Sequence, residues 1–318
     1  MSHDAFRPDL EREIELSRAM TSVRSALAKA EAEPNRVAFH YRAPALWMND
    51  PNGPIYYKGW YHVFYQFNPY GDHWGNMHWG HARSRDLVDW EDLPIALWPS
   101  KARGEDAIYS GSCFLGAGPL GPSSPIAFYT SIGDKRAPEQ WSAMPEDDDL
   151  IKWSKSPTNP ILTSTLQEWR DPFLFTYKGL DYMVTGGGQN GHGIVALYQV
   201  HDATLQKWEY RGILFSHPDQ DVPNIECPNL AQIGNRWVLL VSVHGKVESY
   251  VGDLDSEMHF HSSSRDVLAD GSYASQLVHD RHGKLIHLAW VPTDNHTGWN
   301  GFRTRAANGI APFVAKPA

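Results

Sequence analysis

The chain has 318 residues and a formal net charge of −9 at pH 7. The length allows one large domain or two ordinary ones. The negative charge argues against nucleic acid or an anionic membrane as the partner, because both bind basic surfaces. No apolar run approaches the roughly 20 residues of a membrane helix, and residues 1–20 lack the apolar core of a signal peptide. We therefore expect a cytoplasmic protein without a membrane partner.

The aromatic and cysteine content narrows the possible classes further. The chain contains 13 tryptophans, 14 tyrosines and 12 phenylalanines. Aromatic faces stack on sugar rings, so this content slightly favours a carbohydrate binder, although aromatic side chains also fill protein cores. The only cysteines are Cys113 and Cys227, which fits a reducing compartment at least as well as a disulfide.

Residues 8–33 carry the pattern of one amphipathic helix. Apolar residues recur at the spacing of a single helical face, at Leu16, Met20, Val23 and Leu27. Pro8 suits a first helical turn and Pro34 ends the run. We expect residues 1–35 to form a helical extension that braces the main domain or a partner chain. The second alternative leaves room for a homo-oligomer.

From residue 36 to residue 318 the pattern is that of an all-β domain. Short runs of β-branched and aromatic residues alternate with clusters of Gly, Pro, Asn and Asp, as at residues 55–65. These residues predict a strand, a tight turn at Gly59 and a second strand. The same rhythm returns at residues 173–184 and 230–243, and no long helical pattern intervenes.

A repeat within this domain indicates a propeller. The pattern Leu-x-x-Trp ends at Trp90, Trp153 and Trp208, with 63 and 55 residues between successive tryptophans. A period of this size, with about four strands in each unit, is typical of propeller blades. The length after the helix then predicts a five-bladed β-propeller. The alternative is a β-sandwich in which the three hairpins are unrelated.

Three carboxylates lie in stiff, proline-containing settings far apart in the sequence. They are Asp50 before Pro51, Asp171 between Arg170 and Pro172, and Glu226 before Cys227-Pro228. Each begins a blade-like unit, so a propeller would gather all three on innermost strands around its axis. Cleavage of a glycosidic bond needs one carboxylate to attack or to activate water and another to protonate the leaving oxygen. A single acid at a turn is more often a cap, but three in this setting favour catalysis.

The motifs around these acids resemble those of glycoside hydrolase family 32, the group of β-fructofuranosidases, invertases, levanases and inulinases. The motifs occur in the family's order and run from about residue 39 to residue 300. They are residues 47–53, 64–69, 74–76, 78–81, 109–112, 170–172 and 226–228.

The resemblance implies a five-bladed propeller and a retaining double displacement on β-linked fructose. Asp50 corresponds to the nucleophile, Glu226 to the acid/base and Asp171 to the residue that stabilises the transition state. A nucleophile must be ionised, so we expect hydrogen-bond donors to hold the pKa of Asp50 low, and we expect a dry, negative site around Glu226. We expect Arg170 to keep Asp171 ionised.

The resemblance also implies the residues that contact the sugar. The residues that correspond to the fructose-binding set are Trp47, Asn49, Gln66, Trp74, Ser110, Arg170, Tyr273 and Trp290.

No cofactor is expected, and no metal, because His73, His78 and His192 are not spaced as a ligand set.

The sequence departs from the family pattern in two places. Relatives often have an aromatic residue before the acid/base and Asp after Cys-Pro, whereas Ile225 and Asn229 stand here. The signals of the last blade lie close to Ala318, so we expect the family's C-terminal β-sandwich to be absent. The glycine-rich stretch at residues 186–191 has no functional account from the sequence.

Several functions remain open at this stage. The leading hypothesis is a hydrolase that releases β-D-fructose from sucrose or from fructo-oligosaccharides and fructans, with a small sugar as its partner. A fructosyltransferase would use the same covalent intermediate. A catalytically silent fructan-binding module and an inverting glycosidase acting on arabinan or xylan are the further alternatives. The sequence does not distinguish free from phosphorylated sucrose.

Overall fold

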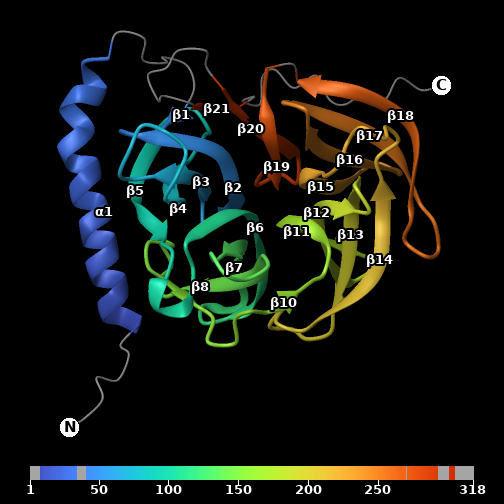
Figure 1. The fold of residues 1–318 in the computed structure, drawn as a ribbon, viewed down its shortest axis with the longest axis horizontal. Helices are drawn as coiled ribbons and strands as arrows, with labels where there is room; N and C mark the ends of the chain where they lie inside the picture. Colours follow the sequence, from blue (N-terminus) through green and yellow to red (C-terminus); the bar gives the residue numbers. More distant parts are fainter. Residues whose placement is uncertain (1–7, 34–40, 270, 293–300, 305–318) are drawn as a thin grey trace.

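The described chain is one helix followed by antiparallel sheets. The computed structural model describes residues 8–33, 41–269, 271–292 and 301–304. Helix α1 (Pro8–Glu31) stands along one side of the molecule, and the sheets are arranged around a common axis (Figure 1). This arrangement confirms an all-β propeller preceded by a helix.

The described strands form five sheets, in each of which neighbouring strands are antiparallel. The first three are consecutive in the chain. They contain β2 (Trp47–Tyr57), β3 (Trp60–Asn68), β4 (His78–Ser84) and β5 (Trp90–Leu97); β6 (Ala107–Gly118), β7 (Gly121–Ile132), β8 (Glu139–Pro145), β9 (Trp153–Lys155) and β10 (Leu162–Thr163); and β11 (Gln167–Tyr177), β12 (Leu180–Gln189), β13 (His192–Val200) and β14 (Trp208–Ser216). A short 3-10 helix, Lys101–Arg103, separates the first two.

The last two sheets complete the circle. The fourth contains β15 (Glu226–Ile233), β16 (Arg236–Val243), β17 (Lys246–Leu254) and β18 (Phe260–Ala269). The fifth combines both ends of the chain, because β1 (Tyr41–Arg42) pairs with β21 (Gly301–Thr304), next to β20 (Leu285–Val291) and β19 (Tyr273–His279). Strands β2, β6, β11, β15 and β19 contact one another in a closed ring and are therefore the innermost strands.

The tryptophan repeat corresponds to one turn at the outer edge of the sheets. Trp90, Trp153 and Trp208 each begin the strand that follows this turn, namely β5, β9 and β14. The leucine three residues earlier is buried and has a positive φ of 56–66° in each case. Trp153 and Trp208 donate their indole N–H groups to the carbonyl oxygens of these leucines.

The fourth sheet has a similar turn, one residue shorter, without the sequence signature. Asp255 accepts hydrogen bonds from the backbone N–H groups of Glu257 and His259, Met258 has a φ of 69°, and buried Phe260 begins β18. Met258 and Phe260 thus correspond to Leu and Trp, with one intervening residue instead of two. The Leu-x-x-Trp pattern detects three turns and misses this one because the turn depends on backbone geometry and burial.

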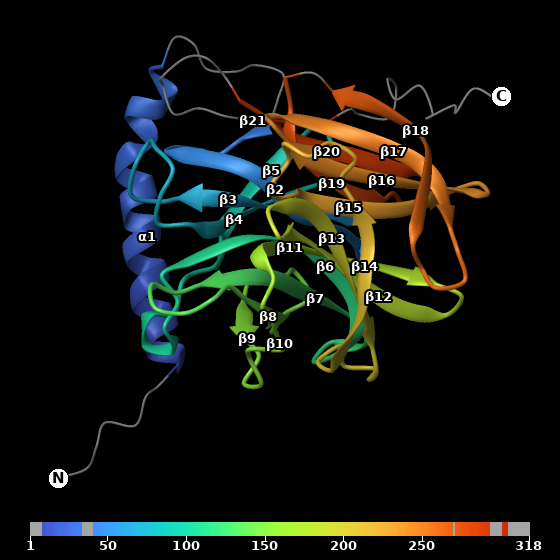
Figure 2. The same cartoon turned by 45° about the vertical axis from the view of Figure 1, so that its right-hand side comes forward.

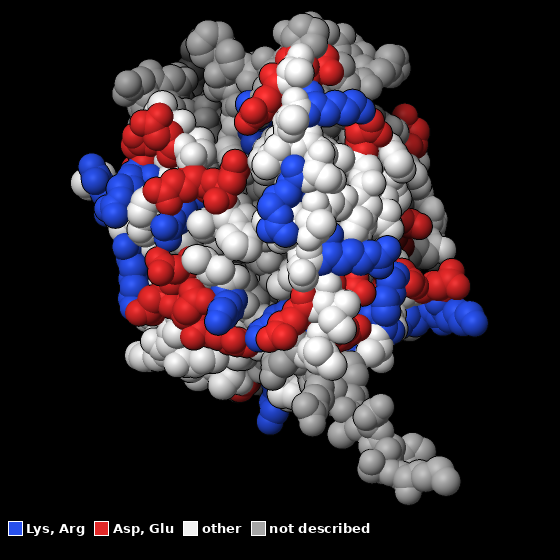
Figure 3. Space-filling model, turned by 90° about the vertical axis from the view of Figure 1, so that its left-hand side faces the viewer, with Lys and Arg blue, Asp and Glu red and all other residues white. Residues whose placement is uncertain are grey.

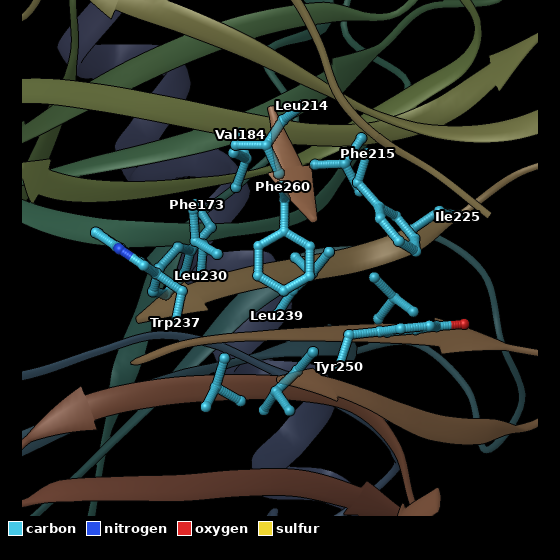
Figure 4. Close-up of a cluster of buried hydrophobic side chains, with 14 of the residues drawn as sticks. Phe173, Val184, Leu214, Phe215, Ile225, Leu230, Trp237, Leu239, Tyr250 and Phe260 are labelled. Carbon is cyan, nitrogen blue, oxygen red and sulfur yellow. The ribbon is translucent and has the colours of Figure 1, made fainter. Parts of the chain in front are cut away.

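The core lies between neighbouring sheets. One cluster fills the space between the third and fourth sheets and includes Phe173, Leu214, Trp237 and Phe260 (Figure 4). Other clusters join the first sheet to the second and the second to the third. Adjacent sheets therefore hold each other in place, which fixes the innermost strands relative to one another.

Helix α1 packs against the first sheet, as the apolar spacing predicts. Ala19, Val23 and Ala30 are buried there. Glu11 accepts hydrogen bonds from the Ser100 hydroxyl and the Ala102 backbone N–H, so the helix also contacts the segment between the first two sheets. Figure 2 shows the helix running along the outside of these sheets. On this side acidic and basic side chains are interspersed (Figure 3).

The two ends of the axis differ in chemistry. A cavity of about 700 Å³ lies at the end where the innermost strands finish, and most of its lining is apolar, including Ile55, Leu115, Phe175, Leu230 and Leu277. The predicted site residues lie at the other end, where the same strands begin.

Candidate active site

The three predicted carboxylates come together at the axis. Asp50 lies on β2, Asp171 on β11 and Glu226 at the start of β15. The Sγ atom of Cys227 is 4.0 Å from Asp50 Oδ2 and 3.5 Å from Asp171 Oδ2. Arg170 connects the other pair, because its guanidinium contacts both Asp171, at 3.9 Å, and Glu226.

Breaks in the strand ladders aim these side chains at the axis. The pairing of each innermost strand shifts register beside a site residue: between Met48 and Pro51, between Arg170 and Phe173, and between Glu226 and Asn229. Bulges of this kind re-aim side chains.

The bulges hold three residues in the left-handed region without the freedom of glycine. Asp171 has a φ of 61°, Cys227 of 45° and Ala274, in the bulge of β19, of 54°. Such a backbone costs on the order of 1–3 kcal/mol per residue and persists only where the surrounding structure imposes it. The end of the axis that carries the acids therefore includes this conformational cost.

Asp50 is held by hydrogen bonds from two elements. Ser110 on β6 donates to Asp50 Oδ2 at 2.7 Å, and the Asn49 amide donates to Oδ1 at 3.0 Å. The Trp47 indole N–H donates in turn to Asn49 Oδ1 at 2.9 Å. Trp47, Asn49 and Ser110 thus lie around the candidate nucleophile.

The expected low pKa of Asp50 is wrong in direction. Burial raises the pKa of this carboxyl above its ordinary value, although the bonds from Ser110 and Asn49 lower it, and the nearby Glu226 charge raises it further. The donors that the motif predicts are present, but the loss of hydration outweighs them.

Gln66 is linked to Asp50 only indirectly, through Asn52 and Ser110. Its side chain is 2% exposed. With the Asn52 amide oriented to satisfy its neighbours, the Asn52 oxygen accepts from Gln66 Nε2 at 3.1 Å and its nitrogen donates to Ser110 Oγ at 3.2 Å. A chain of hydrogen bonds therefore runs from Gln66 through Asn52 and Ser110 to Asp50. Asn52 was not among the predicted site residues, although its position inside the first motif was a signal for it.

Asp171 is the most enclosed of the three acids, with 4% of its surface exposed. Its Oδ2 accepts the Cys227 backbone N–H at 2.8 Å, and its own N–H donates to Thr130 Oγ1 at 3.0 Å. Burial raises the pKa of Asp171 to about 7, because the Arg170 charge, which lowers it, only partly offsets the lost hydration. The expectation that Arg170 keeps Asp171 ionised is thus met only in part. Thr130 is a second contact that the sequence did not reveal.

Glu226 has a different environment from the one predicted. Its side chain is 29% exposed, against 5% for that of Asp171. Arg170 Nη2 donates to Oε1 and the Tyr273 hydroxyl donates to Oε2. The expected dry and negative surroundings are replaced by a partly exposed carboxylate in contact with a cation and a phenol, because Arg170 reaches from the third sheet to the fourth.

Aromatic side chains flank the acids. The Trp47 and Trp290 rings meet edge to face, with centroids 6.2 Å apart, and Trp290 is the register partner of Tyr273. Trp74 is 54% exposed and lies edge-on to Tyr109, with ring centroids 5.9 Å apart. Such exposed aromatic faces can stack on sugar rings.

The described residues show neither a metal centre nor a membrane helix. No group of three or more His, Cys, Asp or Glu side chains within them is placed to hold a metal ion. Within the same residues, no helix is long and apolar enough to cross a membrane.

The comparison with protein families agrees with the geometry. The family described as "Glycosyl hydrolases family 32 N-terminal domain" matches residues 40–306. The chain belongs to this family. The match includes all three carboxylates and every strand that carries them.

The match with each curated relative covers only part of that relative's length. Levanase from Bacillus subtilis is 35% identical over 251 residues, which are 72% of this chain and 35% of the levanase. Sucrose:sucrose 1-fructosyltransferase from Festuca arundinacea is 38% identical over 179 residues, 52% of this chain and 27% of the transferase. The chain thus spans about a third or less of the length of these curated relatives.

A solved structure supports the same fold. The family 32 β-fructofuranosidase BmSUC1 from Bombyx mori is 29% identical and superposes with a TM-score of 0.80, over 91% of this chain and 66% of that one. The match therefore extends over nearly all of this chain.

Proposed function

We propose that this chain carries the catalytic site of a retaining glycoside hydrolase that releases β-D-fructose from sucrose or from fructo-oligosaccharides and fructans. The observation that carries the proposal is the gathering of Asp50, Asp171 and Glu226 at one end of the axis, on strands of three different sheets. We also propose that the five sheets are the five blades of the propeller, each contributing its first strand to the axis.

The reaction would proceed in two steps. Asp50 attacks the anomeric carbon of the fructosyl unit while Glu226 gives a proton to the leaving oxygen, so that one C–O bond breaks as another forms. Water then attacks the fructosyl–enzyme, Glu226 takes the proton from this water, and Asp50 is released. Asp50 suits the first role because Ser110 and Asn49 fix both of its oxygens.

The remaining residues would bind the sugar. Asp171 is placed to hold fructose hydroxyls, because its neighbours Arg170 and Cys227 fix its orientation. Trp47, Trp290 and Trp74 would form the aromatic walls. Asn49, Ser110 and Gln66 would act mainly through Asp50 and Asn52 rather than by broad contact with the sugar.

Transfer to a sugar acceptor is the second candidate function. It is favoured by the 38% identity with a sucrose:sucrose 1-fructosyltransferase, and it uses the same first step. In the second step a sugar hydroxyl would take the place of water.

Product analysis tests the proposal. The chain is incubated with sucrose, with a short inulin-type oligosaccharide and with levan, beside the Glu226→Gln variant. Free fructose from the wild type alone supports the hydrolase, and longer oligosaccharides support the transferase. Absence of any product from all three sugars would contradict both.

A further inference from the structure

The glycine-rich stretch in β12 lies against the non-strand segment that leads to Glu226. Gly186, Gly187 and Gly188 are buried, and Gly186 pairs with Arg170 in the register of β11 and β12. None of the three has a positive φ, so other residues could adopt their backbone conformation. The requirement for glycine must therefore come from space.

The missing side chains leave room for the backbone of residues 223–225. A Cβ atom at Gly186 would lie 2.2 Å from the Ile225 carbonyl oxygen, and one at Gly188 would lie 2.3 Å from the Pro223 carbonyl oxygen. Real Cβ atoms essentially never approach a heavy atom within 3.0 Å. The chain just before Glu226 can therefore lie this close to β12 only because these two positions are glycine.

Backbone hydrogen bonds fasten the same segment to the third sheet. Gly193 N–H donates to the Val222 oxygen at 2.7 Å and Ile225 N–H to the Gly187 oxygen at 3.0 Å. Cys227 N–H then donates to Asp171 Oδ2 at 2.8 Å. Residues 222–227 are thus anchored at their start, middle and end, and Glu226 lies between the last two anchors.

Apolar packing adds to this attachment. The Ile225 side chain is fully buried in the cluster between the third and fourth sheets, together with Phe215 and Val222 (Figure 4). The Glu226 side chain, by comparison, is 29% exposed. Its position therefore depends on its backbone neighbours more than on its own burial.

We propose that Gly186 and Gly188 are positioning residues that seat Glu226, by letting residues 223–225 lie directly on β12. The proposal rests on the proposed function, because it concerns the acid/base of that reaction. A side chain at either position displaces this segment and moves Glu226 away from the leaving oxygen, while Asp50, on the opposite side of the axis, keeps its contacts with Ser110 and Asn49.

The test compares substrates that differ in their need for a proton. Sucrose requires protonation of its leaving oxygen, whereas β-D-fructofuranosyl fluoride releases fluoride with little need for it. For Gly188→Ala and Gly186→Ala we expect kcat/KM to fall about tenfold or more on sucrose. Most of the kcat/KM on the fluoride should be retained, because this quantity reports only the steps up to formation of the fructosyl–enzyme. Equal losses on both substrates would overturn the proposal, since general damage to the site lowers both.

A milder variant and a matched control guard against failure to fold. A Cβ at Gly193 would contact Val222 Cγ1 at 3.0 Å and Ile225 Cγ1 at 3.2 Å, so Gly193→Ala presses on the same segment more gently. We expect it to show the same selective loss on sucrose, to a smaller extent. Gly191→Asn changes the open turn of the same hairpin, where φ is 77° and a Cβ meets nothing within 4 Å. It should leave the ratio of the two activities unchanged.

Amide hydrogen exchange separates this proposal from the proposed function. We expect the Ile225 and Cys227 amides to exchange faster in Gly193→Ala than in the wild type or Gly191→Asn. If the wild type shows no fructosidase activity and Gly193→Ala still exchanges faster than the wild type, only the proposed function is contradicted. Unchanged exchange in Gly193→Ala and Gly188→Ala would overturn the positioning role, whatever the activity.

Discussion

The innermost strands differ between the end of the axis where they begin and the end where they finish. Where the strands begin, their ladders are broken by bulges, and Asp171 and Cys227 are held at positive φ. Where they end, the pairing is regular from Phe173 in β11 and from Asn229 in β15, and the lining is mostly apolar. The comparison teaches that one end is shaped for polar contacts at a conformational cost, whereas the other supplies packing.

The largest expected effect is at the polar end. Asp50→Asn removes the charge that would attack the sugar, so we expect kcat/KM to fall on the order of 10⁴-fold or more. The fold should be kept, because burial already disfavours the charged form of Asp50. Steady-state kinetics and thermal unfolding measure both. Exposed Asp148, changed to Asn, is the control and should keep full activity.

The converse variant lies at the other end of the axis, on β11, the strand that carries Asp171. Phe175 is buried and packs on Tyr182 and Trp237, with ring centroids 5.5 and 5.7 Å apart. Phe175→Ala should lower the free energy of unfolding by about 3 kcal/mol while the activity per folded molecule stays unchanged. Denaturant unfolding and active-site titration test this. A large loss of kcat in the folded variant would contradict the claim that the apolar end contributes to stability and not to activity.

The pH dependence of stability provides a third comparison. The pKa of Asp171 is about 7 in the folded protein and about 3.9 in an unfolded chain. Between these values the folded state binds more protons, so the contribution of Asp171 to stability falls as the pH rises through this window. Asp171→Asn, which retains an acceptor for Cys227 N–H, should therefore become more stable relative to the wild type between pH 4 and pH 8. A constant difference over this range would contradict the burial of the carboxyl.

The smallest expected effect concerns one hydrogen bond. Ser110 donates to ionised Asp50 and lowers its pKa, so Ser110→Ala should raise it. The acid limb of the kcat/KM profile should then move to higher pH. Ser112, on the same strand, is the matched control, since its buried hydroxyl has no hydrogen-bond partner among the described residues. A shift of equal size in Ser112→Ala would show that the effect is not specific to Asp50.

The sequence predicted best what depends on local pattern. The spacing of Leu16, Met20 and Val23 predicted α1, and the motifs around Asp50, Asp171 and Glu226 predicted which acids meet. Those motifs combine proline-containing turns with polar side chains, so they can be recognised from the sequence alone.

What the sequence did not predict depends on packing between sheets. The direction of the Asp50 pKa depends on how much water the neighbouring sheets exclude. The contact of Glu226 with a cation depends on the reach of Arg170 from the third sheet to the fourth. The role of Gly186 and Gly188 appears only when residues 223–225 are seen against β12.

The most direct test of the account is to trap the fructosyl–enzyme. Glu226→Gln, which cannot assist the attack of water, is mixed with β-D-fructofuranosyl fluoride, and the digested protein is examined by mass spectrometry. The account predicts a mass gain of one fructosyl unit on the peptide that contains Asp50, and none in the double variant with Asp50→Asn. An adduct on another residue, or turnover of the fluoride by the double variant, would contradict the assignment of Asp50 as the nucleophile.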